Sequence, residues 1–277
     1  MTSADQPATP PEQAPALLDG VLSGGDIEIK GRVLPASNIT FFGEATVDGT
    51  SVRCVYKPIA GERPLWDFPD GTLAAREVAA YVVSEALGWG IVPRTLMREG
   101  PAGVGMVQEW RDPDESQDPV DIVKVDAIPP GYLHVLDAID GDGTQVSLVH
   151  EDTAALRRMA VFDAIVNNAD RKGGHVLAMS DGHRFGVDHG VCFHVDDKLR
   201  TILWGWAGSS LHPDDAAAVA GLAEVLESPG AQVLERLDEL LAPHEVDAFR
   251  ARADRLLGGQ RMPVPSGEWP AIPWPAF

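Results

Sequence analysis

The order of strand-like and helix-like segments is the feature that most constrains the fold of this chain. Three stretches near the N-terminus are strand-like, residues 26–33, 38–47 and 51–56. Asp48-Gly49, between the last two stretches, is a strong hairpin signal, and Pro58 ends the third strand. These segments predict a small antiparallel sheet in the first part of the chain.

One helix is expected to pack on that sheet. It is predicted over residues 72–87, with its start at Asp70-Gly71-Thr72 and its stop at Gly88. Two further short strands are predicted after the helix, over residues 94–97 and 105–107. The acidic stretch at residues 112–118 then has the composition of a surface connection between two lobes.

The remainder of the chain is predicted to be mainly helical. A helix is expected over residues 153–167, and Asp181-Gly182 marks a second hairpin. Beyond residue 212, Ala, Leu and Val recur at helical spacing in three segments, residues 214–226, 231–241 and 245–257. Strands with one helix first and helices afterwards predict an α+β fold of two lobes with a ligand cleft between them.

The same pattern suggests where the parts of the chain begin and end. Residues 1–20 are expected to be a disordered leader, because the start of the chain is rich in Pro, Ala, Gln and Ser and lacks periodicity. Residues 21–111 would form an N-lobe built on the small antiparallel sheet. Residues 112–277 would form a mainly helical C-lobe.

Charge and composition restrict the partners of the chain. Its 277 residues carry a formal net charge of −20, without a Lys/Arg cluster to offset it, so DNA, RNA and anionic membranes should be repelled. No signal peptide or membrane span is indicated. Cys54 and Cys192 are too few for a disulfide framework and are expected to be buried thiols. We expect a cytoplasmic protein with no nucleic-acid or membrane partner.

Polar residues after the helix at 153–167 are spaced as phosphotransfer chemistry requires. Asp170 is followed by His175 and then by Asp188-His189-Gly190, which fits a catalytic loop and a metal-binding Asp. Asp170 would orient an attacking hydroxyl, and His175 with Asp188 would hold a divalent metal against ATP phosphates. Arg171 would neutralise charge on the transferring phosphoryl group or, alternatively, brace the loop.

Each of these residues also has a structural interpretation. Asp170 is well suited to form a turn, and Asp188 would cap a tight turn if Gly190 took positive φ. His175 stands where kinases usually place Asn. Imidazole binds Mn²⁺ or Zn²⁺ whereas Mg²⁺ prefers oxygen, so His175 indicates a different metal preference or a structural hydrogen bond. Asp163 lies on the apolar face of its helix and is expected to support the catalytic loop.

Lys57 and Glu77 are the candidates for holding ATP from the first part of the chain. Lys57 ends the third strand, where a cleft-facing Lys would pair with the α- and β-phosphates. A strand-end Lys more often points into water. Glu77, however, lies on a helix that is apolar nearly all round, and a buried carboxylate needs a charged partner. We expect a Lys57–Glu77 pair, the alternative being Glu77 with Arg76 or solvent.

Other nucleotide contacts are predicted more loosely, because no Gly-x-Gly-x-x-Gly loop is present. Ser37 and Asn38, in the turn after the first strand, would touch phosphates or simply form the turn. Adenine would meet the backbone of Gln108-Glu109-Trp110. Its apolar cover would come from three side chains, Val55, Leu177 and Val187.

Taken together, these residues resemble the phosphatidylinositol 3-/4-kinase-like branch of the kinase superfamily, which includes the HipA-like bacterial kinases. The Asp-Arg-His-x-x-Asn loop of that family is similar to residues 170–175 here, with Lys172 in place of His and His175 in place of Asn. The Asp-x-Gly of the family matches Asp188-His189-Gly190. Residues 52–58 and 64–73 also resemble an actinobacterial group of phosphatidylinositol-kinase-like proteins.

The resemblance covers most of residues 25–260 and implies a bilobal kinase fold, ATP and a divalent metal. It does not imply a lipid substrate, because an acidic chain without a basic patch suits a phosphoinositide surface poorly. We therefore expect an atypical kinase that uses ATP and Mg or Mn to phosphorylate a hydroxyl of a protein or small molecule. Two alternatives remain, a nucleotidylyltransferase that transfers AMP and a pseudokinase that acts as a nucleotide-binding interaction module.

Overall fold

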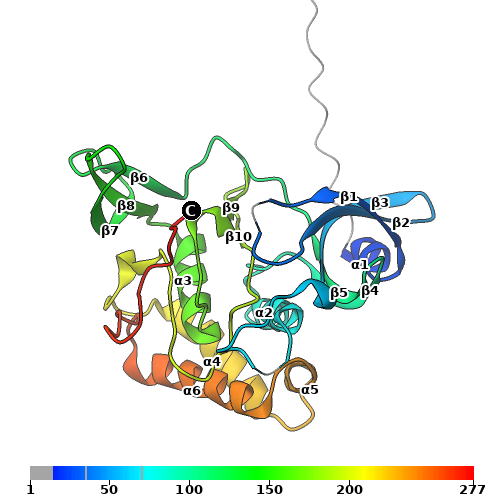
Figure 1. The fold of residues 1–277 in the computed structure, drawn as a ribbon. Coiled ribbons are helices and arrows are strands. Elements are labelled where there is room, and N and C mark those ends of the chain that lie inside the picture. The colour runs from blue at the N-terminus through cyan, green and yellow to red at the C-terminus, as the bar shows by residue number, and fades with distance from the viewer. Residues whose placement is uncertain (1–14, 35, 70) are drawn as a thin grey trace, which may run out of the picture.

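A five-stranded antiparallel sheet forms the first part of the protein (Figure 1). The computed structural model describes residues 15–277 except residues 35 and 70. The strand order is β1-β2-β3-β5-β4. The strands are β1 (Asp26–Arg32), β2 (Phe41–Val47), β3 (Thr50–Pro58), β4 (Thr95–Gly100) and β5 (Gly103–Glu109). The hairpin predicted at Asp48-Gly49 is confirmed, since both residues have positive φ and Val47 pairs with Thr50.

Helix α1 (Pro15–Gly24) covers one face of this sheet (Figure 1). Val21 and Leu22 are fully buried against Cys54, Tyr56 and Val107. The disordered leader expected over residues 1–20 is therefore wrong from residue 15 onward, because apolar side chains at helical spacing find a buried place on the sheet. Residues 1–14 lie outside the described part of the chain.

Helix α2 (Leu73–Ala86) follows the sheet's third strand and a helical turn at Ile59–Gly61. The Thr72 hydroxyl accepts the N–H of Ala75 at 3.0 Å and so caps the helix start. Asp70, also assigned to that start, lies outside the described residues. The Glu62 carboxylate accepts two more N–H groups of the first turn. Gly88 follows the helix with φ +66°, as its predicted stop requires.

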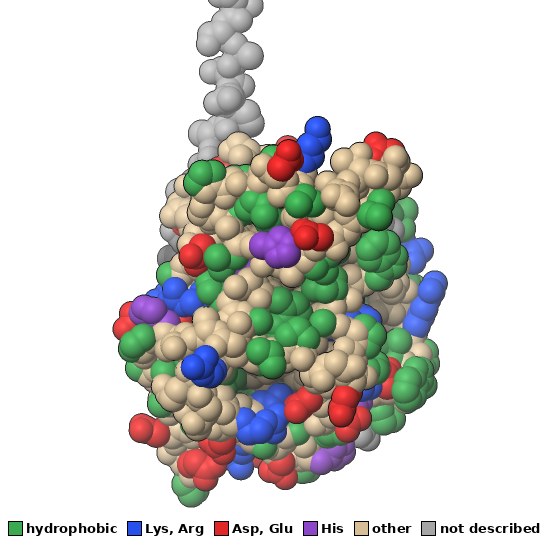
Figure 2. Space-filling view, turned by 90° about the vertical axis from the view of Figure 1, so that its left-hand side faces the viewer, with side chains coloured by type: hydrophobic (Ala, Val, Ile, Leu, Met, Phe, Trp, Pro, Cys, Tyr) green, Lys and Arg blue, Asp and Glu red, His purple; other side chains and the backbone are tan. Residues whose placement is uncertain are grey.

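A three-stranded antiparallel sheet follows, which the sequence analysis missed. Its order is β6-β8-β7, and its strands are β6 (Val120–Lys124), β7 (Tyr132–Ile139) and β8 (Gln145–Glu151). The C-terminal part is therefore less helical than expected, because residues 145–151 pair with strands on both sides. Acidic, basic and apolar side chains are interspersed over the face of the molecule shown in Figure 2.

The remaining elements agree with the predicted order. They are α3 (Ala154–Val166), β9 (Val176–Ala178), β10 (Arg184–Gly186), α4 (Pro213–Glu227), α5 (Gln232–Leu240) and α6 (Pro243–Gly259), with helical turns at Gly173–His175 and Trp204–Trp206. The predicted hairpin at Asp181-Gly182 joins β9 to β10. The α+β prediction is thus confirmed as a mixture of helices and antiparallel sheets.

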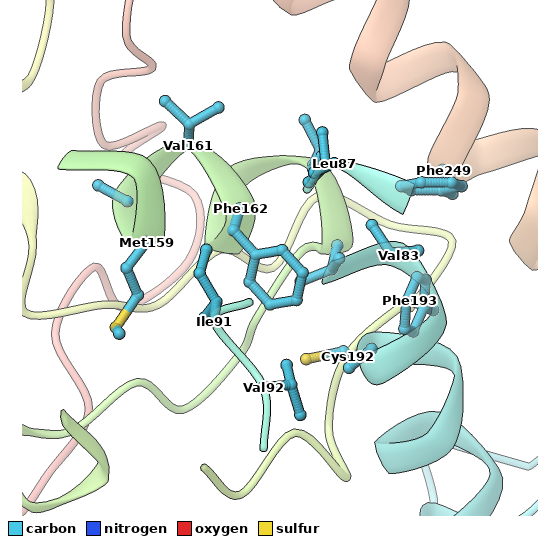
Figure 3. Close-up of a cluster of buried hydrophobic side chains, with 14 of the residues drawn as sticks. Val83, Leu87, Ile91, Val92, Met159, Val161, Phe162, Cys192, Phe193 and Phe249 are labelled. Carbon is cyan, nitrogen blue, oxygen red and sulfur yellow. The ribbon is translucent and has the colours of Figure 1, made fainter. Parts of the chain in front are cut away.

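The larger apolar core joins α2, α3 and α6 behind the candidate site. Val83, Phe162 and Phe249 belong to it and are drawn in Figure 3. Cys192 and Phe193 are fully buried in the same core, so the segment that follows Asp188-His189-Gly190 is held in place. Both cysteines of the chain are buried free thiols, as expected. None of the helices in the described residues combines the length and apolar character needed to cross a bilayer.

Candidate active site

Lys57, Glu77 and Asp188 meet at the centre of the candidate site. The Lys57 ammonium donates to Glu77 Oε1 at 2.6 Å and to Asp188 Oδ1 at 2.7 Å. Lys57 comes from β3, Glu77 from α2, and Asp188 from the segment after β10. The contact predicted between Lys57 and Glu77 is therefore present, and three separate segments are joined through one cation.

Burial explains the charge balance of this triad. Burial lowers the pKa of Lys57, but the Asp188 and Glu77 carboxylates outweigh it and leave that pKa above its usual value. Burial raises the pKa of Glu77, and the nearby ammonium opposes the rise. Glu77 Oε2 also accepts the backbone N–H of His189 at 2.8 Å, so α2 is tied to the Asp188 segment twice. Glu77 is almost fully buried and is placed to hold Lys57 rather than to meet a ligand itself.

Asp188 is the member of the triad that reaches solvent, with 52% of its side chain exposed. The Lys57 ammonium holds the pKa of Asp188 well below its usual range. The carboxylate is therefore ionised and accessible, as a metal ligand must be. The turn proposed as an alternative is different from the one observed, because Asp188 and not Gly190 has positive φ, at 62°.

His175 faces Asp188 from the end of the Gly173–His175 turn. Its Nε2 lies 3.5 Å from Asp188 Oδ2, and its buried Nδ1 has no hydrogen-bond partner. Burial lowers the pKa of His175, which favours the neutral imidazole that can bind a metal. The imidazole thus offers a nitrogen to the same space as the Asp188 carboxylate.

A divalent metal fits this pair of side chains. The described residues contain no group of three or more His, Cys, Asp or Glu side chains that could hold a metal by themselves. Two protein ligands are nevertheless what a nucleotide-bound metal needs, since the phosphates and water supply the others. Asp188 and His175 would hold it, and a nitrogen ligand suits Mn²⁺ better than Mg²⁺.

Asp170 lies beside two cations that the sequence analysis did not place there. Its carboxylate accepts from Arg200 Nη2 at 3.0 Å, and Lys172 Nζ lies 3.3 Å away. The turn-forming role considered for Asp170 falls instead to Asn168, whose Oδ1 accepts the N–H of Asp170. The Asp170 carboxylate is therefore not used by the turn, and part of it remains exposed to solvent.

Arg171 points inward and braces the loop. It is fully buried, and its Nε and Nη2 donate to the Asp163 carboxylate at 2.9 and 2.8 Å. It also donates to the carbonyl oxygens of His175 and Val187 and contacts His189 Nε2 at 2.6 Å. The prediction that Arg171 neutralises a transferring phosphoryl group is corrected, because the buried Asp163 draws the guanidinium away from solvent. The bracing alternative agrees with these contacts.

The backbone of Gln108-Glu109-Trp110, the predicted contact of adenine, has two of its N–H groups engaged within the protein. The N–H of Glu109 donates to Arg94 O at 2.8 Å, and the N–H of Trp110 donates to Arg53 O at 3.0 Å. These donors are used inside the sheet, which extends further than predicted. The Gln108 side chain is buried, and its Nε2 donates a hydrogen bond to Thr95 Oγ1.

The three side chains that were predicted to cover adenine are each partly buried. They are Val55, Leu177 and Val187. Phe185, which pairs with Leu177, shares its face of the β9–β10 hairpin and was not foreseen. The guanidinium of Arg111 lies 4.7 Å over the Phe185 ring. Leu177 and Phe185 therefore form one apolar face of the β9–β10 hairpin, over which the Arg111 guanidinium lies.

Ser37 and Asn38, which were predicted to contact phosphates, do not contribute to the cluster of Lys57, Glu77 and Asp188 in the described part of the chain. Asn38 Oδ1 accepts the N–H of Arg63 at 2.8 Å, which favours the structural alternative for this residue. Ser37 is exposed. In the described part of the chain, neither side chain hydrogen-bonds or ion-pairs with Lys57, Glu77 or Asp188.

Comparison with known proteins identifies relatives of the chain. It is 52% identical over 266 residues to Protein Rv2133c of Mycobacterium tuberculosis (strain ATCC 25618 / H37Rv), a match that covers 93% of this chain and 94% of the relative. The chain belongs to the family of Rv2133c. A search with protein-family models found no match.

Solved structures show what kind of fold this family has. The crystal structure of the Golgi casein kinase aligns with a TM-score of 0.50 at 15% identity, covering 89% of this chain and 75% of the kinase. The Helicobacter pylori proinflammatory kinase CtkA aligns with a TM-score of 0.38 at 14% identity, covering 85% of this chain and 98% of CtkA. The Golgi kinase match shows a kinase-like fold.

The last residues of the sequence pack on the loop at residues 170–175. The N–H of Gly173 donates to Ala276 O at 2.8 Å, and the Phe277 ring lies against Gly173 so closely that a Cβ there would stand 2.3 Å from Phe277 Cε1. No side chain therefore fits at Gly173 while Phe277 stays in place. Glycine is required at this position by the contact and not by its backbone angle.

Replacing Gly173 by alanine should displace the Phe277 ring. We expect Gly173→Ala to lower the free energy of unfolding by about 1 kcal/mol, at the low end of the cost of overpacking, because the Phe277 ring is 49% exposed and has room to turn aside. Urea unfolding measures the change. The double variant Gly173→Ala/Phe277→Ala should lose much less relative to Phe277→Ala alone, because the clash is gone. An equal loss with and without the Phe277 ring would show that this contact is not the cause.

Proposed function

We propose that the protein is an ATP- and metal-dependent phosphotransferase, an atypical kinase that acts on a hydroxyl group. The observation that carries the proposal is the Lys57 ammonium, which bridges Glu77 and Asp188 at 2.6 and 2.7 Å across three segments of a kinase-like fold. Such a cation, held by a buried helix carboxylate beside an exposed acidic residue, matches the parts that phosphoryl transfer needs.

Each side chain then has a defined task. Lys57 binds the α- and β-phosphates, and Glu77 keeps its ammonium in place. Asp188 and His175 hold the metal, which supplies charge neutralisation to the phosphates when bound. When the nucleotide binds, Lys57 exchanges its contact with Asp188 for the phosphates, and the freed carboxylate becomes available to the metal.

Asp170 serves the acceptor. Its carboxylate receives a hydrogen bond from the attacking hydroxyl and orients the oxygen for transfer. Arg200, which lies 3.0 Å from Asp170, keeps positive charge next to the reacting groups, a task first considered for Arg171. The acceptor is a protein or small-molecule hydroxyl, because the net charge of −20 opposes a phosphoinositide surface.

This proposal divides the chain into the two lobes that were expected from the sequence. Residues 21–111 supply the nucleotide-binding lobe, to which α1 adds cover from residue 15, and residues 112–277 supply the catalytic loop and metal ligands. Kinship with the phosphatidylinositol 3-/4-kinase-like branch is supported by Asp170-Arg171 and Asp188-His189-Gly190 in the expected order.

The products formed from ATP test this proposal without knowledge of the acceptor. We expect slow release of ADP from ATP in the presence of Mn²⁺ or Mg²⁺, because water replaces the hydroxyl acceptor, and we expect no ADP without metal. ATP labelled at the α- or γ-phosphate separates the reactions. Transfer of label from the α position would indicate AMP transfer, and binding of ATP without any turnover would indicate an interaction module. Either result contradicts the phosphotransferase proposal.

A further inference from the structure

A cavity with arginines in its walls is separate from the candidate active site, since neither Lys57 nor Asp188 lines it. The cavity has a volume of about 260 Å³. The end of α3, the segment around Leu199, α6 and the chain after α6 form its walls. Three arginines line it, Arg252, Arg255 and Arg261, with one acidic residue, Asp197. In a chain with a net charge of −20, a cavity with three cations and one anion is a local reversal of charge.

Arg252 is the side chain that points to a missing partner. It is 6% exposed, and its Nε and Nη1 donate to the carbonyl oxygens of Ile165 and His194, each at 3.0 Å. Its Nη2 is buried without a hydrogen-bond partner. No carboxylate among the described residues forms an ion pair with it. A buried cation that uses only two of its five N–H donors is costly unless an acceptor reaches the others.

The other two arginines are able to contribute to binding of the same ligand. Arg255 Nη2 contacts both oxygens of Asp197, at 2.8 and 3.0 Å, and more than half of the side chain is exposed. Arg261 donates from Nη1 to Gly208 O. An exposed ion pair is weak, so little free energy is lost when Arg255 exchanges Asp197 for a better-placed anion.

Apolar groups complete the cavity and limit the ligand. Trp204, Leu199 and Leu256 line it alongside the arginines. The Trp204 Nε1 is already used by Ala271 O, so its ring presents an apolar surface. At about 30 Å³ for each water-sized group, the volume admits a small organic molecule of roughly ten non-hydrogen atoms.

We propose that this cavity binds a small organic oxyanion, with its charged group on Arg252, Arg255 and Arg261 and its apolar body against Trp204. Guanidinium groups suit planar carboxylates and phosphates equally, because both accept paired N–H donors. The site is independent of the proposed phosphotransfer. Burial lowers the pKa of Arg252 to about 10, so the side chain still carries its charge at neutral pH.

Titration calorimetry with phenyl phosphate and with benzoate, at constant ionic strength and without nucleotide, tests the site. We expect saturable binding of at least one probe, and the comparison distinguishes a phosphate from a carboxylate ligand. The double variant Arg255→Gln/Arg261→Gln should weaken binding by at least about tenfold, the effect of losing one charge-assisted hydrogen bond. Both residues are at the surface, so the variant is expected to fold.

Two control variants test whether the probes bind to this cavity and not to cationic side chains elsewhere in the protein. Arg236→Gln removes an exposed arginine of α5 and should leave binding unchanged. Lys57→Met/Glu77→Gln removes the cation of the candidate active site together with the buried charge that it neutralises, and should also leave binding of the probes unchanged. The proposal is overturned if the folded wild-type protein binds neither probe. It is equally overturned if Arg255→Gln/Arg261→Gln binds as tightly as wild type or if the folded Lys57→Met/Glu77→Gln variant no longer binds the probes.

Discussion

Replacing Asp163 by alanine is expected to lower the free energy of unfolding by about 3–5 kcal/mol, the cost of leaving a buried charge without its partner. Asp163 and Arg171 are both fully buried, and the guanidinium makes hydrogen bonds to both carboxylate oxygens. Asn168 Nδ2 also donates to Asp163 Oδ1 at 3.0 Å. Burial lowers the pKa of Arg171, but Asp163 outweighs it and raises that pKa, so both members of the pair are charged in the native protein.

Chemical denaturation measures this loss, and two further variants show its cause. Asp163→Ala/Arg171→Met removes both charges and should recover part of the stability lost by Asp163→Ala, because no buried ion is left unpaired. Asp238→Ala removes an exposed aspartate of α5 and should change stability by no more than about 0.5 kcal/mol. If Asp163→Ala were as stable as Asp238→Ala, the bracing role of the pair would be wrong.

Replacing Asp188 by asparagine is expected to reduce metal-dependent ADP release by at least about 10³-fold, the scale of charge neutralisation in phosphoryl transfer. Asparagine has nearly the same shape and tolerates the positive φ of this position, so the fold should be kept. Lys57 keeps its contact with Glu77. The change therefore removes the anionic metal ligand and little else.

Asp196 provides the matched control for this variant. It lies on the segment that follows Asp188, and 75% of its side chain is exposed. Asp196→Asn should release ADP at the wild-type rate, and thermal unfolding should confirm that both variants are folded. Equal rates for Asp188→Asn and wild type would remove Asp188 from the reaction and with it the proposed metal site.

Local chemistry explains why part of the site was predictable from the sequence. Glu77 lies on a helix that is apolar nearly all round, and the requirement for a cation led to Lys57, with which it forms a 2.6 Å contact. Asp48-Gly49 and Asp181-Gly182 indicated two hairpins because their glycines, and Asp48 as well, adopt the positive φ that such turns require. The placement of Asp163 on the buried face of its helix followed from the same 3.6-residue period.

Long-range contacts explain why other parts were missed. Arg200 reaches Asp170 from a segment with no recognisable pattern, and nothing local to Arg171 shows that Asp163 turns it inward. Helix α1 starts in a stretch rich in Pro and Ala. Only the burial of its apolar side chains against the sheet offsets the conformational entropy lost when this stretch becomes ordered. Whether the N–H groups of Glu109 and Trp110 bond within the sheet depends on where β5 ends. Sequence patterns locate the ends of strands poorly.

Thermal unfolding of the wild-type protein with ATP and Mn²⁺ or Mg²⁺, with ATP alone and with metal alone tests the central claim most directly. A ligand at about 100 times its Kd stabilises a folded protein by ~2.7 kcal/mol. We expect ATP with metal to raise the Tm by several degrees, ATP alone to raise it less, and the extra rise from metal to disappear in Asp188→Asn. An unchanged Tm with saturating ATP and either metal would contradict a nucleotide site at Lys57, Glu77 and Asp188.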